Sequence, residues 1–154
     1  MIDLATFSAA GLTFYAAHHA SDYWVQTDHQ AKHKGAAGAE GVRACLLHVS
    51  TYVLTQMTLV SVLAAASGMR WNFWGFVAAM LVSGVTHYLA DRREHGIMFR
   101  LARALPGKVN FLRLGAPRGG HYDDNPSLGT GAWALDQAWH TFWGVWVAAL
   151  LIAI

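Results

Sequence analysis

Three pairs of histidine and aspartate residues share a four-residue spacing within otherwise apolar sequence. The pairs are His18 with Asp22, His87 with Asp91, and Asp136 with His140. Residues four apart in a helix project from the same face, so each pair would present an imidazole and a carboxylate in one direction. These two groups are the ligands of many zinc, iron and manganese sites. The spacing therefore predicts metal chemistry, provided that helices bring the pairs together.

Apolar stretches long enough to cross a bilayer carry all three pairs. Of the 154 residues, 55% are hydrophobic and only 13% are charged, whereas about 25% charged is usual in a soluble domain. A hydrocarbon core of about 30 Å takes about 20 helical residues to cross, which predicts spans at about 4–26, 43–66, 73–95 and 132–154. The expected fold is all-α. It is one domain over the whole chain, an integral membrane four-helix bundle with a long cytoplasmic loop between the third and fourth helices.

The basic residues predict the orientation of this bundle. Ten of the 11 Lys and Arg residues lie in the first and third connections or at their edges, and only Arg70 lies in the second. The positive-inside rule places basic connections in the cytoplasm, and hence both termini outside it. The first span lacks a basic segment before it, so we expect it to be retained rather than cleaved as a signal. The predicted location is a bacterial inner membrane.

The order of residues within the pairs adds a match in depth. The first and third helices run toward the cytoplasm and end with His then Asp, whereas the fourth runs away from it and begins with Asp then His. The three histidines would therefore lie about 12 Å inside the cytoplasmic ends, and the three aspartates about 6 Å inside. His48 in the second span falls between these layers. Ionisable groups in a membrane cost about 2.5 to 3.5 kcal/mol each near its centre, so they need partners or a function.

Seven candidate ligands from four helices are more than one tetrahedral ion can bind. They suit two metals that share a bridging carboxylate. The predicted ligands are His18, Asp22, His48, His87, Asp91, Asp136 and His140. Zn²⁺ is the first candidate, with iron and manganese as alternatives, and which carboxylate bridges stays open. Gln26 and Tyr52 are predicted to orient ligands through hydrogen bonds, with Gln137 a weaker candidate. We expect His29, His33 and His95 to be surface loop residues.

The connection after the third span carries a basic amphipathic segment at about 96–106. Its apolar residues recur at helical spacing, which is typical of a short helix lying on a membrane surface. Basic residues within and beyond it suit an anionic leaflet or a phosphate-bearing ligand. They are Arg100, Arg103, Lys108, Arg113 and Arg118. His121, Asp123 and Asp124 follow in a polar turn, and whether they add ligands stays open.

The first helix motif, HHASDYWVQ from His18 to Gln26, with Lys34 and His48 after it, resembles an uncharacterised family of small bacterial multi-pass membrane proteins. Members of this domain-of-unknown-function family open with a His-x-x-x-Asp-x-x-x-Gln helix. The later motifs HYLAD and LDQAWH are similar to the family's further histidine motifs. The chain also resembles inner-membrane proteins described, by prediction, as metal-dependent hydrolases. The resemblance implies the same topology and the same seven ligands.

These observations predict a membrane metalloenzyme, a hydrolase of a lipid-linked or amphiphilic ester or phosphoester that enters from the cytoplasmic leaflet. The alternatives are a protein that transports or senses metal or protons, and a His-Asp polar network that holds the helices together without metal. Cys45 is the only cysteine, which excludes an intrachain disulfide and a thiolate metal cluster. Membrane lipids are the expected partners, nucleic acid is not, and a homo-oligomer stays open.

Overall fold

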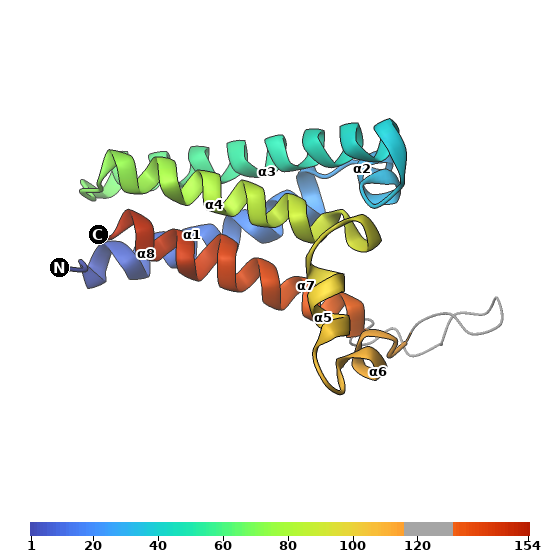
Figure 1. Cartoon of the computed structure of the whole chain (residues 1–154). Helices are drawn as coiled ribbons and strands as arrows, with labels where there is room; N and C mark the ends of the chain where they lie inside the picture. The colour runs from blue at the N-terminus through green and yellow to red at the C-terminus, as the bar shows by residue number, and fades with distance from the viewer. Residues whose placement is uncertain (116–130) are drawn as a thin grey trace.

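Helices alone make up the regular structure of the described residues, 1–115 and 131–154, in a computed structural model of the chain (Figure 1). The prediction of an all-α fold is confirmed. The longest elements are α1 (Leu4–Ala20), α3 (Gly38–Ser67) and α4 (Phe73–Asp91). The C-terminal segment consists of α7 (Gly131–His140), the π-helix η4 (Thr141–Val147) and α8 (Ala148–Ile152). Arg118, His121, Asp123 and Asp124 lie outside the described residues.

Two helices continue through π-helical turns without a break in the backbone. The π-helix η1 (Ser21–Val25) extends α1, and η4 joins α7 to α8. Backbone angles at Ser21 and Ala148 stay in the right-handed helical region, so the chain keeps its direction at these junctions. Single π-helical turns are rare and are frequently found at functional sites. Here η1 contains Asp22, and η4 begins directly after His140.

The ends of the helices differ from the predicted spans for local reasons. The first helix ends at Val25 rather than 26, because Gln26 is extended. The second begins at Gly38, five residues before the predicted 43, because its glycine-rich first turn with Glu40 is helical although it lies outside the apolar run. The third ends at Asp91 rather than 95, because Arg93 adopts a positive φ of 47° and starts the short 3-10 helix η2 (Arg93–His95). The last segment runs over 131–152 rather than 132–154.

The long helical segments pack side by side around a narrow core (Figure 1). Large side chains such as Phe14, Val60 and Ile152 fill it, and alanines such as Ala79 and Ala148 let the helices approach closely. Trp139 fixes α7 against α4, because its indole Nε1 donates a 2.9 Å hydrogen bond to the Thr86 carbonyl. Both termini lie at one end of the bundle, where the Asp3 amide donates to the Ala153 carbonyl at 3.0 Å.

Two helices, α3 and α4, are long and apolar enough to cross a membrane, with mean hydropathies of 1.5 and 1.4 over their most apolar windows. Little of either window is buried inside the protein, 17% for α3 and 33% for α4. Their outward faces carry large apolar side chains, including Leu54 and Val62 on α3 and Leu81 on α4, each more than half exposed. This finding fits a membrane location. The remaining two spans stay a prediction.

The opposite end of the bundle carries the short helices, which are α2 (Asp28–His33), α5 (Met98–Ala104) and α6 (Lys108–Leu112) (Figure 1). Helix α5 lies within the predicted amphipathic segment but ends at Ala104 rather than 106. It buries Met98 and Ala102 and exposes the apolar Leu101, and Ile97, directly before it, is exposed as well. Arg103 forms an ion pair with Glu94, which ties α5 to η2. His29 and His33 lie on α2, so the expectation that they sit in a loop was wrong: a capping box at Thr27 and Gln30 starts a helix there.

Candidate metal centre

The structure brings the seven predicted ligands into one cluster near the end of the bundle that carries the short helices. His18 lies on α1, Asp22 on η1 and His48 on α3; α4 supplies His87 and Asp91, and α7 supplies Asp136 and His140. All four imidazoles are buried, none being more than 2% exposed. The mirrored order of the pairs explains this convergence, because the antiparallel helices then place like residues at like depths.

The closest group of donors joins α3 to α4. His48 Nε2 and His87 Nε2 lie 3.0 Å apart, and each lies 3.1 Å from Asp91 Oδ2. Asp22 Oδ1 lies 3.4 Å from the His48 nitrogen and 3.7 Å from the His87 nitrogen. Two nitrogens and two carboxylate oxygens therefore converge on one small volume.

A second group of donors faces the other oxygen of the same carboxylate. His140 Nε2 lies 3.8 Å from Asp91 Oδ1 and 3.3 Å from Asp136 Oδ1. The His140 ring stacks on the His87 ring with their centroids 4.0 Å apart, which places the two groups next to each other. The carboxylate of Asp91 thus has one oxygen in each group.

A glutamine orients the pair of His18 and Asp22. His18 Nε2 lies 3.0 Å from Gln137 Oε1, which can only accept, so this nitrogen carries the proton. The Nδ1 atom of His18 then has a free lone pair and lies 3.5 Å from Asp22 Oδ2. A ligating histidine commonly donates its other ring N–H in this way. Gln137 was only a weak candidate in the sequence, and the structure gives it this orienting position.

Several buried donor and acceptor atoms of the cluster form no well-aligned hydrogen bond among the described residues, although oppositely charged or polar atoms of the cluster lie 3.1 to 3.4 Å from them. They include Asp22 Oδ1, Asp91 Oδ2 and His140 Nε2. Buried polar atoms are satisfied in the great majority of cases, and exceptions call for an explanation such as an ion. These atoms lie where the two groups of donors converge, so the cluster has a geometry that could hold a cation.

The two residues predicted to orient ligands do so by different contacts. Gln26 Nε2 donates to the backbone carbonyl of Asp22 at 2.9 Å, which steadies the π-helical turn. Tyr52 packs its ring against His87, with centroids 3.9 Å apart. The Tyr52 hydroxyl points away from the cluster and accepts from Gln56 Nε2 at 3.1 Å, so Tyr52 positions His87 by packing rather than by a hydrogen bond.

Lys34 is the residue of the site that sequence reasoning missed. Its Nζ lies 2.9 Å from Asp91 Oδ1, and the Lys34 side chain is 11% exposed. The Lys34 carbonyl accepts from Arg92 Nη1 at 2.8 Å, so α2 is attached to the end of α4. The sequence places Lys34 among the basic residues of the first connection and within the motif of the family resemblance, but nothing in its spacing relates it to Asp91. The signal available in the sequence was Asp91 itself, because a buried carboxylate needs a nearby cation.

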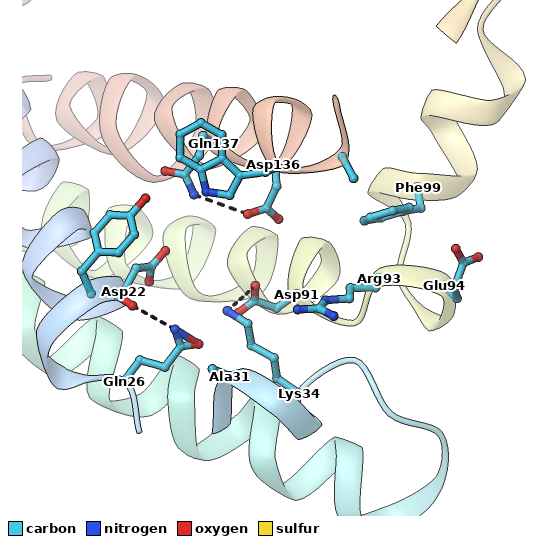
Figure 2. A pocket seen from close by; sticks show the side chains of 13 residues that line it. Asp22, Gln26, Ala31, Lys34, Asp91, Arg93, Glu94, Phe99, Asp136 and Gln137 are labelled. Atoms are coloured by element: carbon cyan, nitrogen blue, oxygen red, sulfur yellow. Dashed lines mark hydrogen bonds and ion pairs between the residues drawn. The ribbon is translucent and has the colours of Figure 1, made fainter. Parts of the chain in front are cut away.

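A cavity of about 480 Å³ lies over the cluster (Figure 2). Asp22, Asp91 and Asp136 line it, whereas none of the four imidazoles does, so the carboxylates lie between the histidines and the opening. Lys34 and Arg93 lie on the wall of the cavity as well. Its volume is that of a small-molecule site.

A separate set of candidate ligands lies on the surface, apart from the cluster. The His29 and His33 rings stack with centroids 4.3 Å apart, and His33 Nε2 lies 3.6 Å from Glu40 Oε1. These side chains are largely exposed, as common surface groups are. They matter as a source of background metal in any stoichiometry measurement.

No protein-family model, curated protein or solved structure matches this chain.

Proposed function

We propose that this chain is a membrane-embedded metalloenzyme with a dinuclear His/Asp centre, and that it hydrolyses a lipid-linked or amphiphilic ester or phosphoester. The observation that carries the proposal is the placement of Asp91, whose two oxygens face separate groups of donors beneath a cavity. Carboxylates in this position bridge the ions of two-metal sites. Of the three aspartates that the sequence left open as the bridge, Asp91 is the one that this geometry supports.

The first group of donors has dimensions that suit a transition-metal ion. His48 Nε2, His87 Nε2 and Asp91 Oδ2 form a nearly equilateral triangle with edges of 3.0 and 3.1 Å. The centre of such a triangle lies about 1.8 Å from each corner, so an ion about 1.1 Å out of its plane would be about 2.1 Å from all three atoms, the usual zinc–ligand distance. Asp22 Oδ1, which lies 3.4 Å from the His48 nitrogen and 3.7 Å from the His87 nitrogen, is placed to supply the fourth ligand.

The second ion would be held by Asp91 Oδ1, Asp136 and His140, at a position nearer the opening. Asp136 is 24% exposed, against 2% for Asp91, and it lines the cavity where a water or a substrate would enter. Paired metals lower the pKa of bound water toward about 7 and polarise the group to be cleaved. A carboxylate at the edge of such a centre is suited to take the proton of that water.

The rest of the bundle favours an enzyme over a conductor. A conducting protein needs a polar path from the cluster to the far end, and among the described residues the polar layer next to the cluster is followed by an apolar core. Gln56 donates to Tyr52 and to the Gly144 carbonyl and accepts from Ser83. Beyond this layer, the buried core of Phe14, Val60, Phe76, Met80 and Ile152 closes the path.

We place the cluster near the cytoplasmic face, with both termini outside the cytoplasm. The basic residues of the described chain gather at the end of the bundle that carries the cluster, apart from Arg70. The termini lie at the other end (Figure 1). Under the positive-inside rule this arrangement gives the cavity a cytoplasmic opening.

One observation favours the rival, a polar network without metal. The ion pair between Lys34 and Asp91 neutralises the most buried carboxylate in the absence of any ion.

Elemental analysis of protein purified in detergent distinguishes a metal centre from a polar network without metal. We expect about two equivalents of one transition metal per chain, as in other two-metal sites. The measurement belongs in a His29→Ala/His33→Ala background, which removes the surface group. A metal content near zero in that background, with the fold intact, would leave the polar network as the function of the cluster.

A further inference from the structure

The wall of the cavity carries two cationic side chains that the metal centre itself does not require. Lys34 and Arg93 come from different elements, the end of α2 and the turn after α4. Figure 2 shows both directed toward Asp91, with Asp136 and Gln137 across the cavity. A metal site built from three carboxylates has no need of further positive charge beside it, so these cations need another explanation.

Lys34 is held in place through its backbone as well as its side chain. Arg92, which is 5% exposed, donates from Nη1 to the Lys34 carbonyl at 2.8 Å. The Lys34 ammonium contacts Asp91 Oδ1 at 2.9 Å, on the oxygen that faces the second group of donors. An ion bound between Asp91 and Asp136 would neutralise that oxygen. The ammonium would then be free to contact an anion at the same place.

Arg93 is held at the cavity in an unfavourable backbone conformation. Its φ of 47° is the only positive φ of a non-glycine residue in the described chain. Such conformations are sparsely populated and cluster at ligand-binding sites. The stem of Arg93 lies directly on Gly35, where a Cβ would come within 2.7 Å of Arg93 Cδ. Among the described residues the guanidinium forms no ion pair with a carboxylate, although Glu94 is its neighbour and pairs with Arg103 instead.

We propose that Lys34 and Arg93 bind a phosphate group of the substrate over the metal centre, so that the substrate is a phosphoester rather than a carboxylic ester. This inference rests on the proposed hydrolase function and narrows it. A guanidinium matches two phosphate oxygens at once, and a lysine adds a compact second charge. The reacting group of a carboxylic ester is neutral before it reacts, so two cations would add little to its binding, whereas a phosphoester is anionic from the start and is bound by them. Two-metal sites are commonly used for displacement at phosphorus.

The test is phosphate binding measured by calorimetry on zinc-loaded protein in detergent, with inorganic phosphate as the probe. Arg93→Gln should weaken binding by about tenfold to a hundredfold, the effect of losing a charge-assisted hydrogen bond. The matched control is Arg43→Gln, which removes an exposed arginine of α3 that does not line the cavity and should change nothing. Arg93→Gly adds a second check, because glycine adopts a φ of 47° without strain. It should lose phosphate binding while its melting temperature stays equal to or above that of the unaltered protein.

The result separates this inference from the proposed function. Zinc content is measured in every sample, and all four proteins should hold the same amount. If zinc is bound but phosphate binds equally to the unaltered protein and to both Arg93 variants, or to none of them, the phosphate inference is wrong and the metal centre stands. If no protein holds zinc, the proposed hydrolase fails by itself. Arg93-dependent phosphate binding would then still identify an anion site.

Competition identifies where the phosphate comes from. In nanodiscs, phosphatidic acid mixed into phosphatidylcholine should displace inorganic phosphate if the substrate is a lipid. Glycerol phosphate in solution should displace it if the substrate is soluble. Displacement by either supports the inference and assigns the source. Failure of both phosphomonoesters to compete would overturn it, because a site that binds free phosphate but no phosphate ester is not a substrate site for a phosphoester.

Discussion

Replacing Lys34 with Met is expected to destabilise the protein without metal and to tighten metal binding. Lys34 Nζ lies 2.9 Å from Asp91 Oδ1, with the two side chains 11% and 2% exposed. Removing one partner of a buried ion pair costs about 3 to 5 kcal/mol. Asp91 keeps His48 and His87 at 3.1 Å from its other oxygen, so we expect the lower figure, about 3 kcal/mol.

The thermodynamic cycle gives the effect on metal affinity. In the metal-loaded protein an ion beside Asp91 takes over the role of the ammonium, so the substitution should cost little there. The 3 kcal/mol lost by the metal-free protein then appears as metal binding that is tighter by about a hundredfold. The ammonium and the second ion compete for one oxygen, and Met, of similar length, removes the competitor without opening a large cavity.

Thermal unfolding in detergent with a chelator or with zinc, together with zinc titration against a chelating dye, measures both effects. Lys32→Met is the matched control, because Lys32 lies on the same helix but is exposed. It should change neither the melting temperature nor the affinity. If Lys34→Met instead lost its zinc, Asp91 would not be the bridging ligand. If it melted like the unaltered protein in the chelator, the buried ion pair would contribute nothing, and the reasoning from its geometry would fail.

Three further predictions test other parts of the structure. His87→Ala should lose most of the bound metal and several degrees of melting temperature, because His87 belongs to two of the candidate ligand groups. His29→Ala should keep the metal of the cluster. Full metal content in His87→Ala would refute the assignment of the cluster as the metal site. Gly144→Ala should destabilise by about 1 to 3 kcal/mol in denaturant unfolding, because its Cβ would lie 2.7 Å from a buried hydroxyl oxygen; Gly11→Ala, whose Cβ meets its nearest neighbour at an ordinary 3.6 Å, should be neutral. A cysteine replacing Ile154, in a background without the native cysteine, should react only from outside the cytoplasm, and reaction from the cytoplasm alone would reverse the proposed topology.

The convergence of the His-Asp pairs could be predicted because helical geometry alone determines it. A spacing of four residues fixes the face of each pair, and the mirrored order fixes its depth. Neither step requires knowledge of side-chain conformations. The depth of His48 on α3 follows in the same way from its distance to the helix end, and the structure places it 3.0 Å from His87. That the cluster binds metal stays a prediction.

The contacts of the site that come from connections could not be predicted. Lys34 reaches Asp91 only because the chain turns back at α2, and no periodicity encodes that turn. The end of the third helix at Asp91 depends on the positive φ of Arg93, a residue that rarely adopts it. The roles of the two Asp91 oxygens likewise depend on a side-chain rotation that spacing leaves free. The spacing of residues in the sequence determines which face of a helix each one occupies, whereas turn geometry and side-chain rotamers depend on packing.

The π-helical turn after His140 has a consequence for how this segment can change over evolution. His140, Gly144 and Ala148 are all buried, at steps of four residues that would drift by about 40° each around a regular α-helix. The wider turn of η4 offsets this drift, so the buried positions continue from His140 to the apolar core. A π-helical turn amounts to one residue inserted into an α-helix. Deleting that residue would rotate the donor end by about 100° relative to the core end. Substitutions can therefore accumulate independently on either side of η4, but an insertion or deletion within η4 would put the donor end and the core end out of alignment.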